Sequence, residues 1–479
     1  MKTYRVLVFS VIEMKSPFRL GSGESRSPFA DLPVLRSLAE IPYIPGATLA
    51  GAFAGRLTSD QKKSWLGQPE AKHEALPSPL VVDDAFPVPG QRKALIWPVE
   101  LRPQVTLLRD SLTALGKHHF TTEMLPVGVR FPFFCRCDLH EKDLVAFTNA
   151  IGSFLMRGGS LGGKANAGNG VWKADKVCIK QLNMTKQPDR TLWMSFFHGF
   201  EWNGVWDDIA SVVDQPLNLQ SDLPEVGDWS LTLHISFPRP GLHLSAGMSG
   251  MPKKDHPDLS QAQRQRIGLD GKLTSEYVDY GTAVKGRLRT AMEMLLRTWL
   301  RARDKENWDR ESLQKVVPFK PTKKSSSDEL NAFFGHTGKK GQWKVSESSW
   351  TGTPNPSPQD HIRIDEFTQH VIDGAKFVFE PISGGMCSCT VAVSDKAACQ
   401  WQKALLFNAA ALLELEILPW GGHGSRGYLG ATVRIENKAG LKADLLTAFA
   451  DLDSFIMRLA KDQHGPTSES NIEAGMVEE

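Results

Sequence analysis

Apolar and polar residues follow the same succession twice along the chain. An apolar strand pattern opens each half, at residues 4–12 and again at residues 229–237. In both halves a glycine turn, a helical pattern, strands interrupted by a long polar excursion, a second helical pattern and a last strand follow. This succession is β-α-β-β-α-β, so the sequence predicts an α+β protein built from two tandem ferredoxin-like units with insertions.

Three pairs of glycine-containing blocks support this duplication. GATLAG at 46–51 has a counterpart in GTAVKG at 281–286, and both run into a helical pattern. The other two pairs are FTTEMLPVG with FVFEPISGG, and LGGKANAGNG with WGGHGSRGYLG. Because the three pairs occur in the same order, they favour a tandem duplication over a chance likeness of glycine-rich segments.

The same patterns predict where the units begin and end. Between the halves lies a segment rich in tryptophan and phenylalanine, whose composition indicates a packed connector more than a flexible linker. The C-terminal end is acidic and has the composition of a solvated tail. We therefore expect a first unit at 1–180, a connector at 181–227, a second unit at 228–460 with insertions at 249–280 and 303–360, and a flexible tail at 461–479.

The composition narrows the function classes only slightly. The formal net charge is +2 and the tail is acidic, so the rest of the chain has a modest positive excess that favours polyanionic partners. No stretch reaches the roughly 18 apolar residues of a membrane span, and the N-terminus has the pattern of an opening strand and not of a signal peptide. The six cysteines include two Cys-x-Cys pairs in apolar runs, which we expect to be buried thiols in a reducing cytoplasm.

The glycine turn at Gly46 and Gly51 has the spacing of a phosphate-binding P-loop but not its chemistry. A P-loop needs Lys and then Ser or Thr after the second glycine, and Ala52 and Phe53 stand there. Two interpretations remain. The first amides of the helix can meet an anion, or the glycine allows close packing of helix on strand.

Several motifs in order carry a resemblance to a known family. They are RLGSG (19–23), ADLPVLR (30–36), PYIPGATLAGA (42–52), RPQVTLLRDSLTALGKHHFTTEMLPVG (102–128) and LGGKANAGNGV (161–171). In this order they resemble a RAMP-superfamily backbone subunit of type III CRISPR effector complexes. The second half matches more loosely, and two such units in one chain resemble the tandem backbone proteins of type III-D-like systems.

The resemblance implies a role in a ribonucleoprotein. Such subunits stack along a guide RNA in the cytoplasm, and a β-hairpin thumb interrupts the duplex of guide and complementary target RNA. Here the thumbs would be at about 103–122 and 360–379. The implied partners are the guide, the target, other RAMP subunits and a large signature subunit, with no membrane. The residues implied to bind RNA are Arg26, Arg36, Gly46, Thr48, Gly51, His118, His119, Gly162, Gly163, Lys164, Lys285, Arg287, Arg289, His423 and Arg426.

The resemblance also implies a catalytic residue, Asp31. Catalytic members of the family cut target RNA with a divalent metal through an aspartate at this place, so Mg²⁺ or Mn²⁺ is the implied cofactor. A carboxylate can bind such an ion or orient the ribose 2′-OH, but phosphate oxygens must complete the site. In the second half Asp255 has the matching spacing from a glycine, Asp258 and Asp270 are alternatives, and an inactive second unit is equally open.

Two other functions stay open on the sequence. One is a subunit that only holds the guide RNA, in which Asp31 is a loop residue. The other is a metal-independent endonuclease that processes precursor guide RNA with histidines such as His118 and His119. Cleavage that requires magnesium, a guide and a complementary target would separate the leading hypothesis from both.

Overall fold

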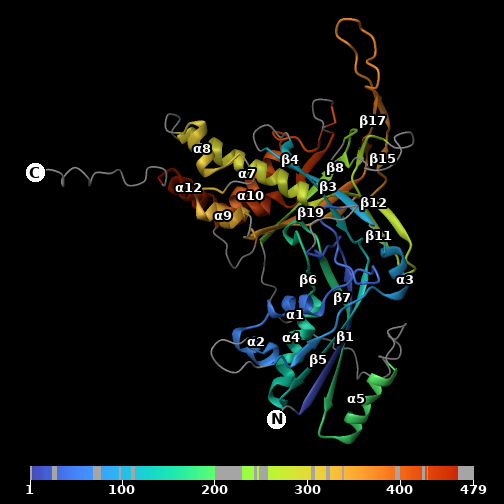
Figure 1. Ribbon diagram of the computed structural model, residues 1–479. Helices are drawn as coiled ribbons and strands as arrows, with labels where there is room; N and C mark the ends of the chain where they lie inside the picture. The colour runs from blue at the N-terminus through green and yellow to red at the C-terminus, as the bar shows by residue number, and fades with distance from the viewer. Residues whose placement is uncertain are drawn as a thin grey trace, which may run out of the picture. The chain divides into compact units, whose positions relative to one another are not determined.

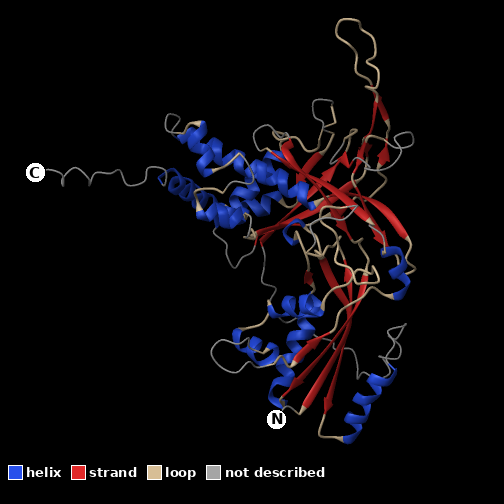
Figure 2. Cartoon of the chain, viewed as in Figure 1, coloured by secondary structure: helices blue, strands red, loops and turns tan. Residues whose placement is uncertain are grey.

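The structure, a computed structural model, is made of two compact units that mix helices and strands (Figures 1 and 2). This confirms the predicted α+β class. The first unit comprises the described residues of 1–104, 120–225 and 263–276, and the second those of 105–119, 226–262 and 277–479. The described residues are 3–23, 30–67, 77–96, 99–108, 114–199, 229–241, 245–246, 257–303, 308–319, 324–336, 339–393, 400–422, 427–428 and 430–461.

The first unit is built on an antiparallel sheet with β1 in its centre. Tyr4 of β1 lies opposite Leu139 of β5 on one side and Asn183 of β7 on the other. Because both edges of β1 are paired and both faces are covered, most of its residues are buried. The sheet order is β2-β5-β1-β7-β6, with β1 at Tyr4–Met14, β2 at Leu80–Val82, β5 at Arg130–Leu139, β6 at Gly159–Ser160 and β7 at Val171–Asn183.

Helices cover both faces of this sheet (Figure 1). Phe53, Trp65 and Phe147 from three helices form one aromatic cluster against one face. On the other face Trp193, in the predicted connector, packs with Leu7. The helices are α1 (Gly46–Ala54), α2 (Ser59–Leu66) and α4 (Leu144–Arg157) on the first face and α5 (Gln187–Gly199) on the second. The other helical segments of this unit are α3 (Pro89–Arg92) and the short 3₁₀ turns η1 (Lys93–Leu95), η2 (Glu141–Asp143) and η3 (Ala165–Ala167).

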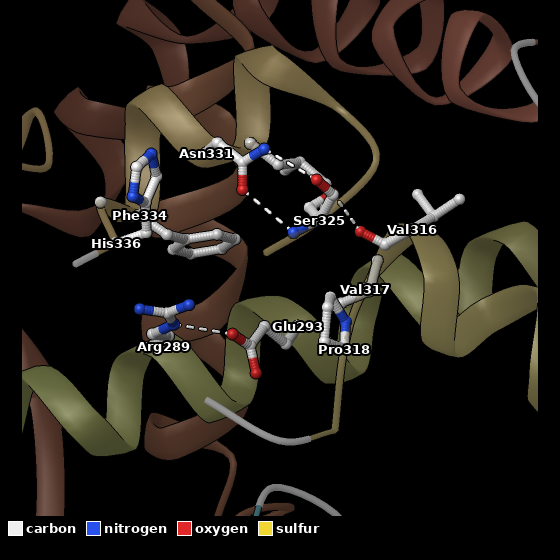
Figure 3. Close-up of a pocket in the computed structure, with 11 residues that line it drawn as sticks. Arg289, Glu293, Val316, Val317, Pro318, Ser325, Asn331, Phe334 and His336 are labelled. Carbon is white, nitrogen blue, oxygen red and sulfur yellow. Dashed lines mark hydrogen bonds and ion pairs between the residues drawn. The ribbon is translucent and has the colours of Figure 1, made fainter. Parts of the chain in front are cut away.

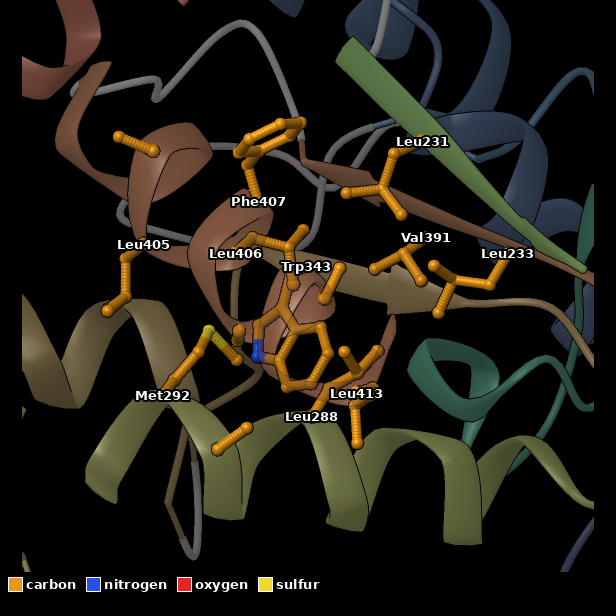
Figure 4. Close-up of a cluster of buried hydrophobic side chains, with 14 of the residues drawn as sticks. Leu231, Leu233, Leu288, Met292, Trp343, Val391, Leu405, Leu406, Phe407 and Leu413 are labelled. Carbon is orange, nitrogen blue, oxygen red and sulfur yellow. The ribbon is translucent and has the colours of Figure 1, made fainter. Parts of the chain in front are cut away.

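The second unit has its own four-stranded antiparallel sheet, ordered β13-β19-β8-β20. Leu288, Trp343 and Leu413 from helices and sheet meet in one buried cluster (Figure 4). The strands are β8 (Trp229–Ser236), β13 (Trp343–Val345), β19 (Met386–Val393) and β20 (Thr432–Ile435), and the helices are α7 (Gly281–Arg303), α8 (Arg310–Val316), α9 (Asp328–Phe334), α10 (Gln400–Glu414), α11 (Lys438–Asp444) and α12 (Leu446–Lys461).

The two sheets share one strand order. In chain order β1, β2, β5 and β7 of the first unit correspond to β8, β13, β19 and β20 of the second. In both sheets the second of these strands lies beside the third, the third beside the first, and the first beside the fourth. A helix follows the first strand and another follows the third, α1 and α4 in one unit and α7 and α10 in the other.

Each polar excursion of the sequence contains a hairpin. In the first, β3 (Glu100–Leu107) pairs with β4 (Ala114–Met124). In the second, β16 (Gln359–His361) pairs antiparallel with β17 (Phe377–Glu380), and a further bridge joins Ile364 to Val371 beyond them. The chain between β16 and β17 extends as a long loop in Figures 1 and 2.

Two segments belong to a different unit from the one expected, and the first is the described part of residues 105–119, which is predicted in the first unit but is part of the second. The sequence predicts 249–280 as an insertion of the second unit, but residues 263–276 pack in the first. Buried Gln91 holds this segment, because its Nε2 donates to the carbonyl oxygens of Gly128 and Gly268 at 3.0 and 2.9 Å. The segment carries most of β11 (Gln263–Ile267) and β12 (Leu273–Asp279), and the remaining strands are β9 (Ser245–Ala246), β10 (Leu259–Gln261), β14 (Ser348–Ser349), β15 (Asn355–Pro356) and β18 (Ile382–Ser383).

We expect Gln91→Ala to loosen the 263–276 segment. Besides its two donated bonds, Gln91 accepts the N–H of Arg130 at 2.9 Å, so the substitution leaves buried groups without partners, at a cost of about 1–3 kcal/mol each. Hydrogen exchange in 263–276 should accelerate and the thermal midpoint should fall. Gln181→Ala, at an exposed position of β7, is the control. Unchanged exchange in 263–276 would contradict this role for Gln91.

Candidate nucleic-acid interface

Asp31 is fixed against the second strand of the first hairpin. Its N–H donates to the carbonyl oxygen of Thr121 at 3.0 Å, and its Oδ2 accepts the N–H of Thr121 at 2.8 Å. The residue is exposed. Its other carboxylate oxygen makes no hydrogen bond to the described part of the chain, so it can bind a ligand from solution without breaking an internal contact.

Lys164 reaches the same strand from the glycine-rich segment. Its Nζ donates to Oε1 of Gln104 and lies 4.8 Å from the centre of the Phe120 ring. Gln104 in turn donates to the hydroxyl of Thr122 at 3.3 Å. Phe120, Thr121 and Thr122 are consecutive in β4, so this strand brings together the predicted catalytic carboxylate and the predicted RNA-binding lysine.

Two positively charged residues of the first unit, Lys164 and Arg19, have lowered pKa values and contact no acidic residue in the part of the chain that the structure describes. Burial, together with the charges of Arg19 and Arg102, lowers the pKa of Lys164 to about 8. Burial also lowers the pKa of Arg19. Arg102 is paired with Glu100, whereas neither Lys164 nor Arg19 contacts a carboxylate among the described residues. An anionic ligand would stabilise both charges.

Arg19 is not among the residues that the sequence predicts to bind RNA. It lies in the RLGSG motif, and its carbonyl oxygen accepts the N–H of Gly163 at 3.1 Å. Its backbone is therefore bound to the glycine-rich segment that carries Lys164. The available signal was a basic residue beside a glycine motif, but its proximity to Lys164 depends on a contact between segments far apart in the chain.

Several of the predicted glycines have internal packing roles. A Cβ on Gly46 would lie 2.0 Å from the carbonyl oxygen of Val82, and the amide of Gly46 donates to Oδ1 of Asp84 at 2.7 Å. The first turn of α1 thus already has an anionic partner within the protein. Gly162 has a φ of +78°, and its Cβ would lie 2.1 Å from the carbonyl oxygen of Arg19. These contacts explain both glycines without a ligand.

The remaining predicted RNA-binding residues of the first half of the chain differ from Gly46 and Gly162 in how much space surrounds them. A Cβ on Gly51 would meet nothing within 4 Å, and one on Gly163 would make only an ordinary contact with Arg19. Thr48 is half-buried in α1, and His119 is exposed on β4. The side chain of His118 lies outside the described part of the structure.

Arg36, one of the residues predicted to bind RNA, makes contacts inside the first unit. Its Nη2 is paired with Oε1 of Glu123, and their side chains are only 12% and 4% exposed. Its Nη1 donates to the carbonyl oxygens of Leu95 and Ile96 at 2.6 and 2.9 Å. Oε2 of Glu123 accepts the N–H of Val34 at 2.9 Å, so this ion pair holds the loop that follows Asp31.

In the second unit the predicted cations lie along α7. Nζ of Lys285 donates to the carbonyl oxygen of Trp343 at 3.0 Å and lies 4.7 Å from the ring centre. Burial, with the charges of Arg289 and Lys340, lowers the pKa of Lys285 to about 7. Burial also lowers the pKa of Arg287, whose Nε is buried without a hydrogen-bond partner in the described part of the chain.

Arg289 points into a small pocket among α7, α8 and α9 (Figure 3). Its Nε donates to Oε1 of Glu293 at 2.7 Å, and its guanidinium lies 4.8 Å from the centre of the Phe334 ring. The cavity measures about 20 Å³, which is room for a water molecule and not for a nucleotide. Glu293 thus neutralises Arg289 within the second unit.

Of the remaining predicted residues, two aspartates are described by the structure and the others are not. Asp258 is exposed and directly precedes β10, whereas Asp270 accepts the N–H of Lys272 in the turn between β11 and β12. Within the described ranges no group of three or more His, Cys, Asp or Glu side chains is placed to bind a metal ion. Arg26, Asp255, His423 and Arg426 lie outside the described residues.

Comparisons with known proteins identify one family. The model of the RAMP superfamily matches residues 11–172 and 274–430, which together make up most of the chain. The two matches fall in the two halves, each including the glycine turn and the glycine-rich segment. No curated protein sequence matches the chain. None of the described helices has the length and apolar character needed to cross a membrane.

We expect Gly46→Ala and Gly51→Ala to have opposite effects on stability. The new methyl group at position 46 would clash with the backbone of β2, at a cost of about 1–3 kcal/mol. At position 51 the methyl group meets open space, and alanine should stabilise the helix by about 0.5–1 kcal/mol. Urea unfolding of the two variants measures both. Equal stability of both variants and the wild type would contradict the packing role of Gly46.

Lys164→Met should stabilise the RNA-free protein at pH 7 and weaken its binding of RNA. The pKa of Lys164 is about 8 in the folded chain and near 10.4 when unfolded, so between these values the unfolded chain binds more protons. The stability contributed by this group therefore rises with pH across that window, and the advantage of methionine should shrink towards pH ~10. Thermal unfolding across pH and RNA titrations measure both effects.

Lys176→Met, at an exposed position of β7, is the control for this prediction. It should change neither the stability nor the RNA affinity by a comparable amount. If Lys164→Met is less stable than the wild type at pH 7, the charge of Lys164 is compensated inside the protein and the argument for an anion fails.

Proposed function

Because the chain belongs to the RAMP superfamily, which suggests a CRISPR-associated RNA-binding subunit, we propose that it is a backbone subunit of a type III effector complex and cleaves target RNA at Asp31. We interpret each of its two sheets as a ferredoxin-like unit with a thumb hairpin, β3–β4 in the first and β16–β17 in the second. The proposed partners are the guide RNA, complementary target RNA, other RAMP subunits and a large subunit, in the cytoplasm.

One observation supports this proposal above the others. An exposed carboxylate and a lysine that contacts no carboxylate among the described residues meet at β4 in the first unit, and the charge of Arg19 acts on that lysine. Cations that repel each other at a partly desolvated site destabilise the RNA-free protein, and phosphate groups would relieve that repulsion. RNA backbones supply phosphates at regular spacing and are recognised by shape and charge more than by base edges.

The reaction that fits this site is cleavage of a phosphodiester by the neighbouring ribose hydroxyl. The 2′-oxygen bonds to phosphorus, the bond from phosphorus to the 5′-oxygen breaks, and the proton of the 2′-OH ends on the 5′-oxygen. The products are a 2′,3′-cyclic phosphate and a 5′-OH, so no water or other co-reactant is consumed.

The residues of this chain have separate parts in that reaction. The N–H of Thr121 holds Oδ2 of Asp31, which leaves the other oxygen to orient the 2′-OH or bind a divalent ion. Lys164 and Arg19 bind the phosphate groups and fix the strand against β4. A bound Mg²⁺ or Mn²⁺ would supply charge stabilisation at the phosphate, and because Asp31 is one carboxylate, RNA phosphate oxygens must complete its coordination.

Asp31→Asn should remove one target-RNA cut in the assembled complex. Asparagine keeps an acceptor for the N–H of Thr121 but lacks the negative charge that a metal ion or a proton acceptor needs. We expect the rate of that cut to fall by about 10²–10⁴-fold, with guide and target binding unchanged. The measurement maps the products from one labelled target, and Asp60→Asn, at an exposed position of α2, is the control.

Different outcomes of this assay would identify the alternative functions. If every product persists at the wild-type rate with Asp31→Asn, the subunit only holds RNA at this site. Cleavage that survives EDTA and acts on precursor guide RNA would instead indicate metal-independent processing, with His118 and His119 as the residues to test. A 2′-deoxy substitution at the scissile ribose should block the local cut alone.

A further inference from the structure

The second unit holds one carboxylate by the same two hydrogen bonds that hold Asp31. The N–H of Asp258 donates to the carbonyl oxygen of Val378 at 2.8 Å, and Oδ2 of Asp258 accepts the N–H of Val378 at 2.8 Å. In the first unit the corresponding distances between Asp31 and Thr121 are 3.0 and 2.8 Å. In both cases one residue supplies an N–H donor and a carboxylate acceptor to a single residue of a hairpin strand.

The residues that follow continue the correspondence. After Asp31, Leu32 forms a parallel bridge with Thr122. After Asp258, Leu259 pairs in parallel with Phe379. Thr122 and Phe379 each come directly after the residue that binds the carboxylate, and a glutamate follows each of them, Glu123 and Glu380.

The strands involved are also equivalent. Thr121 lies in β4 and Val378 in β17, the second strands of the two hairpins. Both strands lie within the repeated blocks FTTEMLPVG and FVFEPISGG, where Thr121 and Val378 occupy the same position. Both aspartates are exposed. The two units therefore present a carboxylate at one equivalent place.

We propose that Asp258 is the catalytic aspartate of a second RNA-cleaving site, at which a second phosphodiester of the target is broken by its own 2′-OH. This inference rests on the proposed function of Asp31, since the chemistry is the same in both units. The spacing from a glycine favours Asp255, which lies outside the described residues, whereas the two hydrogen bonds favour Asp258.

The surroundings of the two carboxylates differ in charge. Phe120 of the first unit is in contact with Lys164, whereas its counterpart Phe377 stacks on His361, with ring centres 5.2 Å apart. Nε2 of His361 is hydrogen-bonded to the hydroxyl of Tyr428, from the second glycine-rich segment. A glycine-rich segment thus reaches the base of the hairpin in both units, through a lysine in one and a tyrosine in the other.

The test compares single variants in the assembled complex with one labelled target. Asp258→Asn should remove a cut different from the one that Asp31→Asn removes, reducing its rate by about 10²–10⁴-fold. The double variant should lose both cuts. Asp360→Asn is the matched control, because Asp360 is exposed and lies opposite Val378 on the other side of β17. It and Asp255→Asn should keep both cuts.

A second readout does not depend on catalysis. With Fe²⁺ and ascorbate in place of magnesium, hydroxyl radicals should break the bound target around two positions in the wild type and around one in Asp258→Asn. Thermal unfolding and copurified guide RNA should match the wild type, because asparagine keeps an acceptor for the N–H of Val378.

The outcomes separate this inference from the proposed function. If Asp31→Asn removes a cut and Asp258→Asn leaves every cut and both radical footprints, the second site is inactive and the inference is overturned. If Asp255→Asn removes the second cut, the hydrogen-bond equivalence is wrong. If neither Asp31→Asn nor Asp258→Asn changes any product, or the wild type cuts nothing, the proposed function itself fails.

Discussion

The candidate site depends on one interaction, the pairing of an aspartate with a single residue of a hairpin strand through both its backbone N–H and its carboxylate. This pairing fixes the loop that follows β1 to β4 and leaves one carboxylate oxygen exposed. The buried pair of Arg36 and Glu123 supports the same loop a few residues later. A carboxylate held in this way loses little conformational freedom when it binds a ligand.

The charges of the buried cations indicate which kind of ligand this geometry suits. Folded chains ordinarily pair or expose their cations, because a desolvated charge without a partner is costly. Lys164 and Arg19 in the first unit instead have pKa values lowered by burial and contact no carboxylate among the described residues. The protein tolerates this cost in its RNA-free state, which is the expected signature of a surface built for a polyanion.

Those parts of the fold that depend on the spacing of residues along the chain could be predicted from the sequence. Alternation placed both cysteines of the Cys-x-Cys pair at Cys135 and Cys137 on one buried strand face, and the structure confirms this, since both side chains are fully buried. The ordered glycine blocks predicted a duplication, and the two sheets have the same strand order. In each case spacing along the chain carries the information.

Contacts between distant segments could not be predicted in this way. The segment QRQRI of β11 has one apolar anchor, Ile267, and a sequence this polar reads as a surface loop. Gly46 was ambiguous because the carbonyl oxygen of Val82 that requires it lies far along the chain. The likeness between Asp258 and Asp31 depends on pairing with a strand more than a hundred residues away, which a count of spacing along the chain does not detect.

The pKa of Lys164 with and without guide RNA is the measurement that tests the central claim most directly. Titration of ¹³C-methylated lysines by NMR, with Lys164→Met used to assign the signal, would measure it in both states. The account predicts a pKa of about 8 in the RNA-free protein and a value raised above the ordinary 10.4 in the complex, because phosphate stabilises the charged form. A pKa that stays near 8 when RNA is bound would contradict the claim that these buried cations serve an RNA backbone.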